Sequence, residues 1–122
     1  MDIELTREYC LSLPLVTEDM AFGPECLVFR ICNKIFACLN LDGRDIIAVK
    51  SDPDYALELR DRFPDIEPAW HWNKRYWNQF SLKGGLSTEM IKSLIRHSYS
   101  EVVKSLPRKI KIENPVICTV VQ

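Results

Sequence analysis

Three apolar runs separated by very short links constrain the fold of this chain more than any other feature. The runs are residues 26–32, 35–41 and 45–50, and the links between them are Asn33-Lys34 and Asp42-Gly43. Asn tolerates positive φ, and Asp-Gly is a strong signal for a type I′ turn, so both links favour antiparallel hairpins. The sequence therefore predicts a three-stranded meander in the middle of the chain.

The turns also predict which side chains share a face of this meander. If residue 32 pairs with 35, and 41 with 44, the two faces differ in character. The first face is apolar and comprises Leu27, Phe29, Ile31, Phe36, Cys38, Ile47 and Val49. The second is mixed and comprises Cys26, Val28, Arg30, Cys32, Ile35, Ala37, Leu39, Ile46, Ala48 and Lys50. We expect the first face to meet the core and the second to be partly wet.

Helix signals flank the meander on both sides. A first helix is expected from Asp2 to about residue 12, and a second over 53–63, each followed by a Pro. The longest helix is expected over 87–106, where apolar residues repeat at helical spacing. Two further extended stretches are expected near 67–72 and 76–82.

Together these elements predict an α+β fold, with one antiparallel sheet and helices on one face. The predicted order is one helix, three strands, one helix, two strands and one helix. We expect one domain over residues 1–109, with 17–25 as a loop or a short strand. Residues 110–122 form a C-terminal extension, either an added strand or a loose tail.

Size and composition are those of an ordinary soluble domain. The chain has 122 residues, of which 47% are hydrophobic and 27% charged. No apolar run approaches the roughly 20 residues that a membrane span needs. The acidic N-terminus lacks the basic and apolar regions of a signal peptide. We therefore expect a cytoplasmic protein that does not use a membrane as a partner.

The cysteines favour neither a disulfide framework nor a metal site. There are five of them, none is spaced as C-x-x-C, and no His lies near any of them in sequence. We expect buried free thiols that act as small hydrophobic side chains. No metal and no cofactor are expected.

Residues 68–78 are the most unusual stretch of the chain, because they combine four large aromatic residues with one His, two Asn and two cations. Charge is also segregated along the chain: residues 69–111 hold nine Lys/Arg and two Asp/Glu, whereas the net charge of the whole is −1. Cations meet phosphates, and flat rings stack on bases. This composition indicates a binding surface for nucleic acid.

Several motifs resemble the MmcQ/YjbR family. The run Trp70-His71-Trp72-Asn73-Lys74-Arg75-Tyr76-Trp77 is similar to its "(Y/W)-H-x-N-K-x-x-W" signature. His97-Ser98-Tyr99, the stretch 106–109, the stretch 9–14 and the hairpin around Lys34 are similar as well, so the resemblance covers residues 5–109. It implies a CyaY-like (frataxin-like) or secretion-chaperone-like sandwich and a DNA-binding function.

Matching the signature position by position, and adding the neighbouring cations, indicates ten binding residues for DNA or another ligand. They are His71, Asn73, Lys74, Arg75, Trp77, His97, Tyr99, Lys104, Arg108 and Lys109. We expect Lys74 and Arg75 to contact phosphate as one patch with the cations of 104–111, so that DNA affinity is modest and falls with salt.

Two alternatives to DNA binding remain at this point. In the first, His71, Asn73, Lys74, His97 and Tyr99 converge on a pocket for a small molecule or anion. In the second, the chain is a protein-interaction or chaperone-like module, as the fold analogy allows. The sequence shows no nucleophile elbow, Gly-rich phosphate loop or pair of catalytic carboxylates, so we expect a protein that is not an enzyme.

Overall fold

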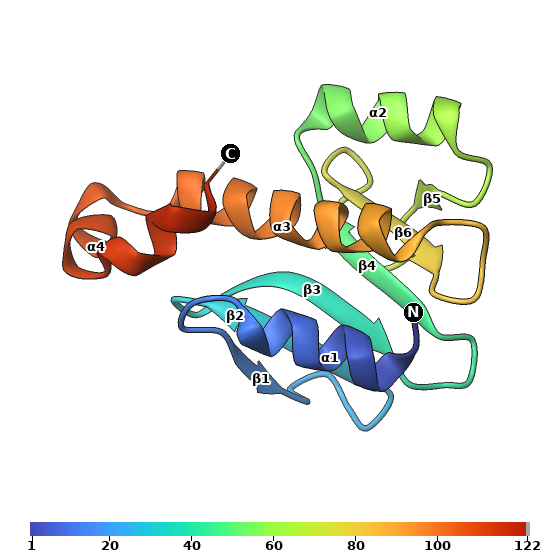
Figure 1. Cartoon of the computed structure of the whole chain (residues 1–122), viewed down its shortest axis with the longest axis horizontal. Coiled ribbons are helices and arrows are strands. Elements are labelled where there is room, and N and C mark those ends of the chain that lie inside the picture. The colour runs from blue at the N-terminus through green and yellow to red at the C-terminus, as the bar shows by residue number, and fades with distance from the viewer. Residues whose placement is uncertain (122) are drawn as a thin grey trace.

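The computed structural model describes residues 1–121 as one six-stranded antiparallel sheet whose helices pack on one face (Figure 1). The helices are α1 (Ile3–Ser12), α2 (Pro53–Arg62), α3 (Thr88–Ser105), α4 (Arg108–Glu113) and the 3₁₀ helix η1 (Pro115–Val120). The strands are β1 (Thr17–Asp19), β2 (Cys26–Ile31), β3 (Lys34–Asn40), β4 (Ile46–Lys50), β5 (Glu67–Pro68) and β6 (Trp77–Ser81). Their order in the sheet is β1-β2-β3-β4-β6-β5. The predicted α+β class with a single antiparallel sheet is confirmed, and the segment 17–25, expected to be a loop or a short strand, contains β1.

Side-chain caps set where the three long helices begin. The side chains of Asp2, Asp52 and Ser87 each accept a hydrogen bond from a backbone N–H three residues further on. Asp52 thus caps α2, and Pro53 takes the first helical position. Within residues 1–121, no helix has both the length and the apolar character needed to cross a bilayer.

A β-bulge shifts the register of the first hairpin. Phe29 pairs with Ala37 and Arg30 pairs with Ile35, so Phe36 is an extra residue on β3. The turn is then Cys32-Asn33, with φ of 47° and 68°, instead of the predicted Asn33-Lys34.

The bulge reverses the predicted facing of three β3 residues. Ala37 and Leu39, predicted on the wet face, join the main core, whereas Cys38 moves to the other face. That prediction was wrong because one extra residue inverts the alternation of every residue beyond it.

The second link is wider than a two-residue hairpin. Leu39 pairs with Ile47, which leaves a loop whose backbone has positive φ at Gly43 and at Asp45. Asp42 closes a local turn by accepting a hydrogen bond from the backbone N–H of Arg44 at 3.1 Å. The loop projects beyond the sheet and provides side chains to the site described below.

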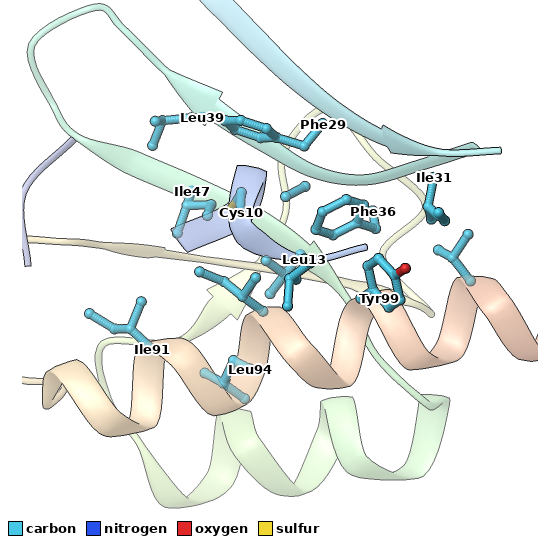
Figure 2. Packing of buried hydrophobic residues seen from close by; sticks show 14 of the residues in the cluster. Cys10, Leu13, Phe29, Ile31, Phe36, Leu39, Ile47, Ile91, Leu94 and Tyr99 are labelled. Atoms are coloured by element: carbon cyan, nitrogen blue, oxygen red, sulfur yellow. The ribbon is translucent and has the colours of Figure 1, made fainter. Parts of the chain in front are cut away.

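The main core lies between the sheet and the helices. Figure 2 shows Phe29 and Phe36 of the sheet lying over Tyr99 of α3, with Cys10 of α1 buried nearby. The rings of Phe36 and Tyr99 meet edge to face, with 5.4 Å between their centroids. Burial raises the pKa of the Cys10 thiol to about 12, so this cysteine stays protonated and unreactive.

The C-terminal extension is neither of the two structures predicted for 110–122. Its described part continues α4 and then forms η1, and Ile117 is fully buried in the main core. Gln122 lies outside the described residues. A strand is absent here because Pro115 begins a 3₁₀ turn after Asn114, and Ile110, Ile117 and Val120 hold the segment against the core.

The expectation that all cysteines are free was wrong. Cys26 of β2 and Cys38 of β3 form a disulfide, with 6.3 Å between their Cα atoms. The bulge brings Cys38 onto the face opposite the helices, where Cys26 already lies; Cys38 opposes Val28, and Cys26 lies diagonally across. Cys10, Cys32 and Cys118 are free thiols.

Candidate functional site

The face of the sheet opposite the helices, here called the open face, holds a second apolar cluster and a pocket. The buried members of the cluster are Val28, Cys38, Ala48, Ala69 and Trp77. The pocket has a volume of about 720 Å³, which is in the range of small-molecule sites. Its floor is formed by β3, β4 and β6, and its walls by residues 22–25, by 40–44 and by 70–72.

One wall of the pocket is aromatic. Trp72 stacks on Trp77 with 4.5 Å between ring centroids, and the exposed ring of Phe22 meets Trp72 edge to face at 6.1 Å. Trp77 is only 8% exposed, because Trp72 covers it. Trp77, one of the predicted binding residues, is therefore mostly covered, whereas the rings of Trp70 and Phe22 are 47% and 62% exposed.

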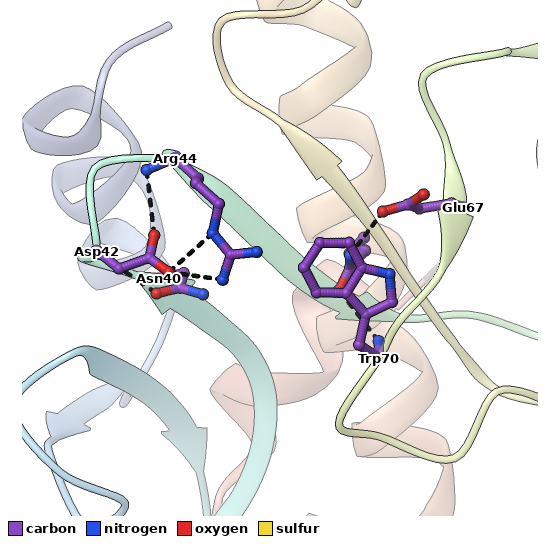
Figure 3. Close-up of polar contacts among 6 residues, drawn as sticks. Asn40, Asp42, Arg44, Glu67 and Trp70 are labelled. Carbon is purple, nitrogen blue, oxygen red and sulfur yellow. Dashed lines mark hydrogen bonds and ion pairs between the residues drawn. The ribbon is translucent and has the colours of Figure 1, made fainter.

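Buried polar groups hold the loop between β5 and β6 against this wall. The side chain of Gln79 accepts a hydrogen bond from the backbone N–H of Trp70 at 3.1 Å and donates one to Glu67 at 2.8 Å (Figure 3). From the other side, the Arg60 guanidinium donates to the carbonyl oxygen of Lys74 and to the Asn78 side chain. Because both ends of the loop are tied to the sheet, Trp70 is presented on a fixed backbone.

The opposite rim of the pocket carries a paired cation. The Arg44 guanidinium lies 2.6 Å from a carboxylate oxygen of Asp42 and 4.8 Å from the centroid of the Trp70 ring (Figure 3). The hydrogen bond from Arg44 lowers the pKa of the Asp42 carboxyl, and the carboxyl in turn raises the pKa of Arg44. Arg44 thus connects the loop after β3 with the loop before β6 across the mouth of the pocket.

Four of the predicted binding residues lie on the exposed loop before β6. They are His71, Asn73, Lys74 and Arg75. His71 lines the pocket, whereas the side chain of Asn73 turns inward to accept the backbone N–H of Arg75 at 3.0 Å. The Lys74 ammonium donates to the carbonyl oxygen of Trp70. Lys74 and Arg75 are both exposed, and neither forms an ion pair within residues 1–121; the Arg75 guanidinium lies 5.5 Å from the centroid of the Tyr76 ring.

His97 and Tyr99 are not part of this site. Both belong to α3, on the other side of the sheet from His71. His97 accepts a hydrogen bond from the backbone N–H of Asp52 at 3.2 Å, and its ring packs against Tyr55. The predicted pocket that joined both histidines was wrong, because the sheet separates them.

His97 and Tyr99 each form a hydrogen bond that holds α3 against another segment of the chain. Burial lowers the pKa of His97, which favours the neutral ring that accepts a hydrogen bond. The Tyr99 hydroxyl donates to the carbonyl oxygen of Pro14 at 2.7 Å, and burial raises its pKa.

The two basic groups expected to form one patch lie apart. Lys104, Arg108 and Lys109 are at the end of α3 and the start of α4, which Figure 1 places at one end of the long axis of the molecule. The loop that carries Lys74 and Arg75 lies beside α2 and β6 in the same view. Lys104 and Lys109 also form exposed ion pairs with Glu101 and Glu113. The sequence predicted these cations individually, but not their separation.

Several residues of the site carried no recognisable signal in the sequence. Phe22 and Glu25 lie in a segment that reads as a plain loop, and Asp42 and Arg44 belong to what reads as a hairpin turn. An exposed Phe beside Gly-Pro and an Arg after Asp-Gly are the only cues, and both are common in ordinary loops.

Comparison with known proteins points to one family for most of the chain. The YjbR family model matches residues 11–101. The chain is 35% identical over 107 residues to the protein YbdF of Escherichia coli O157:H7, covering 87% of this chain and 88% of YbdF. It is 26% identical to YjbR of Escherichia coli K12, covering 89% of this chain and 93% of YjbR.

Solved structures show the same fold. The crystal structure of Deinococcus radiodurans protein DR2400 superimposes with a TM-score of 0.88 at 28% identity, covering 93% of this chain and 88% of that one. The crystal structure of a protein from Pseudomonas syringae gives a TM-score of 0.70 at 28% identity, covering 80% of this chain and 96% of that one. The sheet and its helices are therefore a shared architecture.

Proposed function

The chain belongs to the YjbR family, and we propose that it is a non-enzymatic binding protein whose open-face pocket holds a small ligand with a flat ring. The observation that carries this proposal is the pocket of about 720 Å³ walled by Phe22, Trp70 and Trp72. Flat apolar walls with a few polar groups at the rim are typical of small-molecule sites. A binding role is favoured over a catalytic one because the charged side chains of Asp42 and Arg44 form an ion pair with each other.

A titration with small flat probes tests this proposal. Benzamide, benzamidine and benzoate are nearly equal in size and differ in charge. When each is titrated against the ¹⁵N-labelled protein, at least one is expected to shift the signals of residues 22–25, 38–48 and 70–79, including the indole N–H signals of Trp70 and Trp72. All three tryptophans of the chain lie at this site, so the indole signals report on it directly.

A matched pair of variants separates the pocket from the rest of the surface. Phe22→Ala removes an exposed ring of the wall and is expected to weaken probe binding about 5-fold or more, as loss of a stacking contact does. Leu57→Ala removes a side chain of similar exposure (58%, against 62% for Phe22) on α2 and is expected to change nothing. The proposal fails if no probe shifts these signals at millimolar concentration.

DNA binding is the second candidate, and one observation favours it. The unpaired cations Lys74 and Arg75 lie on the same exposed loop as Trp70 and His71, so a phosphate and a base could meet this loop together. The separate group Lys104, Arg108 and Lys109 is not needed for such a contact.

A salt titration with a short single-stranded DNA tests the second candidate. Binding at low salt with a log–log slope that becomes flatter by about 1.4 in the Lys74→Ala/Arg75→Ala double variant supports it, since each phosphate contact to a single strand contributes about 0.7. The Arg108→Ala/Lys109→Ala double variant is the control, because its cations lie at the far end of the molecule. Equal loss in both variants would indicate non-specific attraction, and no binding at 50 mM salt removes the candidate.

A further inference from the structure

We propose that the open-face pocket selects ligands that carry a positive charge beside their flat ring, such as an aryl amidine or an aryl ammonium. This inference rests on the proposed function, because it names the ligand class of the same pocket. Three features of the rim support this preference. They are the position of Arg44, the charges of the lining residues, and a loop that supplies both an aromatic ring and a carboxylate.

The rim of the pocket already holds one cation, the guanidinium of Arg44, in an environment that attracts positive charge. Arg44 pairs with Asp42 at 2.6 Å and lies over the face of Trp70 at 4.8 Å. The carboxylate of Glu25 is close enough to raise the pKa of Arg44 further. A carboxylate and the electron-rich face of an indole both favour positive charge, so the protein itself displays the preference of this rim.

The balance of charge around the pocket favours a second cation over an anion. The charged lining residues are Glu25, Asp42 and Arg44, and the last two neutralise each other. Glu25 is exposed and forms no ion pair within residues 1–121. Lys74 and Arg75 are not among the lining residues. A cationic ligand therefore gains an attraction to Glu25, whereas an anion meets repulsion.

A single loop offers this carboxylate together with an aromatic ring. The chain turns at Gly23, where φ is 113° and the backbone N–H donates to the carbonyl oxygen of Met20 at 3.0 Å. This turn leaves Phe22 and Glu25 on the same wall of the pocket. A side chain at position 23 is strained at that φ, so the turn depends on glycine. Phe22, Trp72 and Glu25 line the same pocket, so a ligand ring against the aromatic wall shares the pocket with this carboxylate.

The three probes named above form the test, since they differ mainly in charge. Benzamidine is expected to bind about 2- to 5-fold more tightly than benzamide, and benzoate more weakly than either, which is the range expected of an exposed charge pair. The advantage of benzamidine is expected to shrink in 0.5 M salt, because screening weakens exposed charge pairs.

Two variants identify the group responsible. Glu25→Gln keeps the shape of the wall and is expected to bring benzamidine to the affinity of benzamide. Asp61→Asn removes another exposed carboxylate, on α2, and is expected to preserve the difference. Benzamide or benzoate binding as tightly as benzamidine overturns the charge preference and leaves the pocket intact. If none of the three shifts the pocket signals, the proposed function itself fails.

Discussion

The side-chain hydroxyl of Ser98 donates a hydrogen bond to the carbonyl oxygen of Phe36, the extra residue of the β3 bulge, and accepts one at 2.8 Å from the backbone N–H of Lys50. A fully buried serine of α3 thus bridges a backbone carbonyl of β3 and a backbone N–H of β4. This contact links the longest helix to the bulge that decides the facing of β3.

Replacing Ser98 with Ala is expected to lower the free energy of unfolding by about 1–3 kcal/mol, because it removes the hydrogen-bond partner of a buried carbonyl and of a partly buried N–H. Urea unfolding measures the change. Ser93→Ala on the same helix is the control and is expected to stay within about 0.5 kcal/mol of the wild type. Equal effects of the two substitutions would contradict this role of Ser98.

Stability is expected to fall as the pH is lowered from 7.5 to 5, through His97. Burial lowers the pKa of this ring from its ordinary value of 6.5, so as the pH drops the unfolded chain takes up a proton before the folded one does. The stabilisation that the neutral His97 ring contributes is fully present above pH 6.5 and is lost as the pH falls below that value. Urea unfolding across this range measures the slope. His97→Asn is expected to flatten it, and a flat wild-type profile would count against the buried neutral ring.

The exposed His71 provides the control for this pH dependence. His71→Asn changes a histidine on the other side of the sheet and is expected to leave the slope as in the wild type.

Reduction of the Cys26–Cys38 disulfide is expected to lower the free energy of unfolding by up to roughly 3 kcal/mol, the loop-closure value for its sequence separation of 12. Thiol titration in denaturant checks the pairing first. Three thiols are expected to react before reduction, namely Cys10, Cys32 and Cys118, and five after it. Cys26→Ser is expected to remove the effect of reductant, whereas Cys118→Ser is not. Five reactive thiols in the untreated protein would refute the bond.

Truncating Ile117 to Ala is expected to cost about 2–5 kcal/mol, because its side chain is fully buried among residues of the main core. Thermal or urea unfolding measures the loss. Val116→Ala is the matched control, since Val116 is 45% exposed on the same 3₁₀ helix. A loss within about 0.5 kcal/mol for Ile117→Ala would show that the C-terminal segment is dispensable for the fold.

Much of the fold could be predicted because its signals are local. The caps at Asp2 and Ser87, the proline after α1 and the apolar stripe of α3 each act within a few residues, so they can be recognised in the chain alone. The same holds for the family signature around His71, which lies on one loop.

The sheet register and the site depended on contacts between distant residues. The bulge at Phe36 is held by Ser98, 62 positions later, and the pocket needs Arg44 to meet Trp70 across two loops. No pattern within either segment records such a pairing. Local chemistry was thus enough to decide which helices and strands form, whereas the packing of α3 on the sheet decided which side chains share the open face, because burial and hydrogen bonding act between segments that only the folded chain brings together.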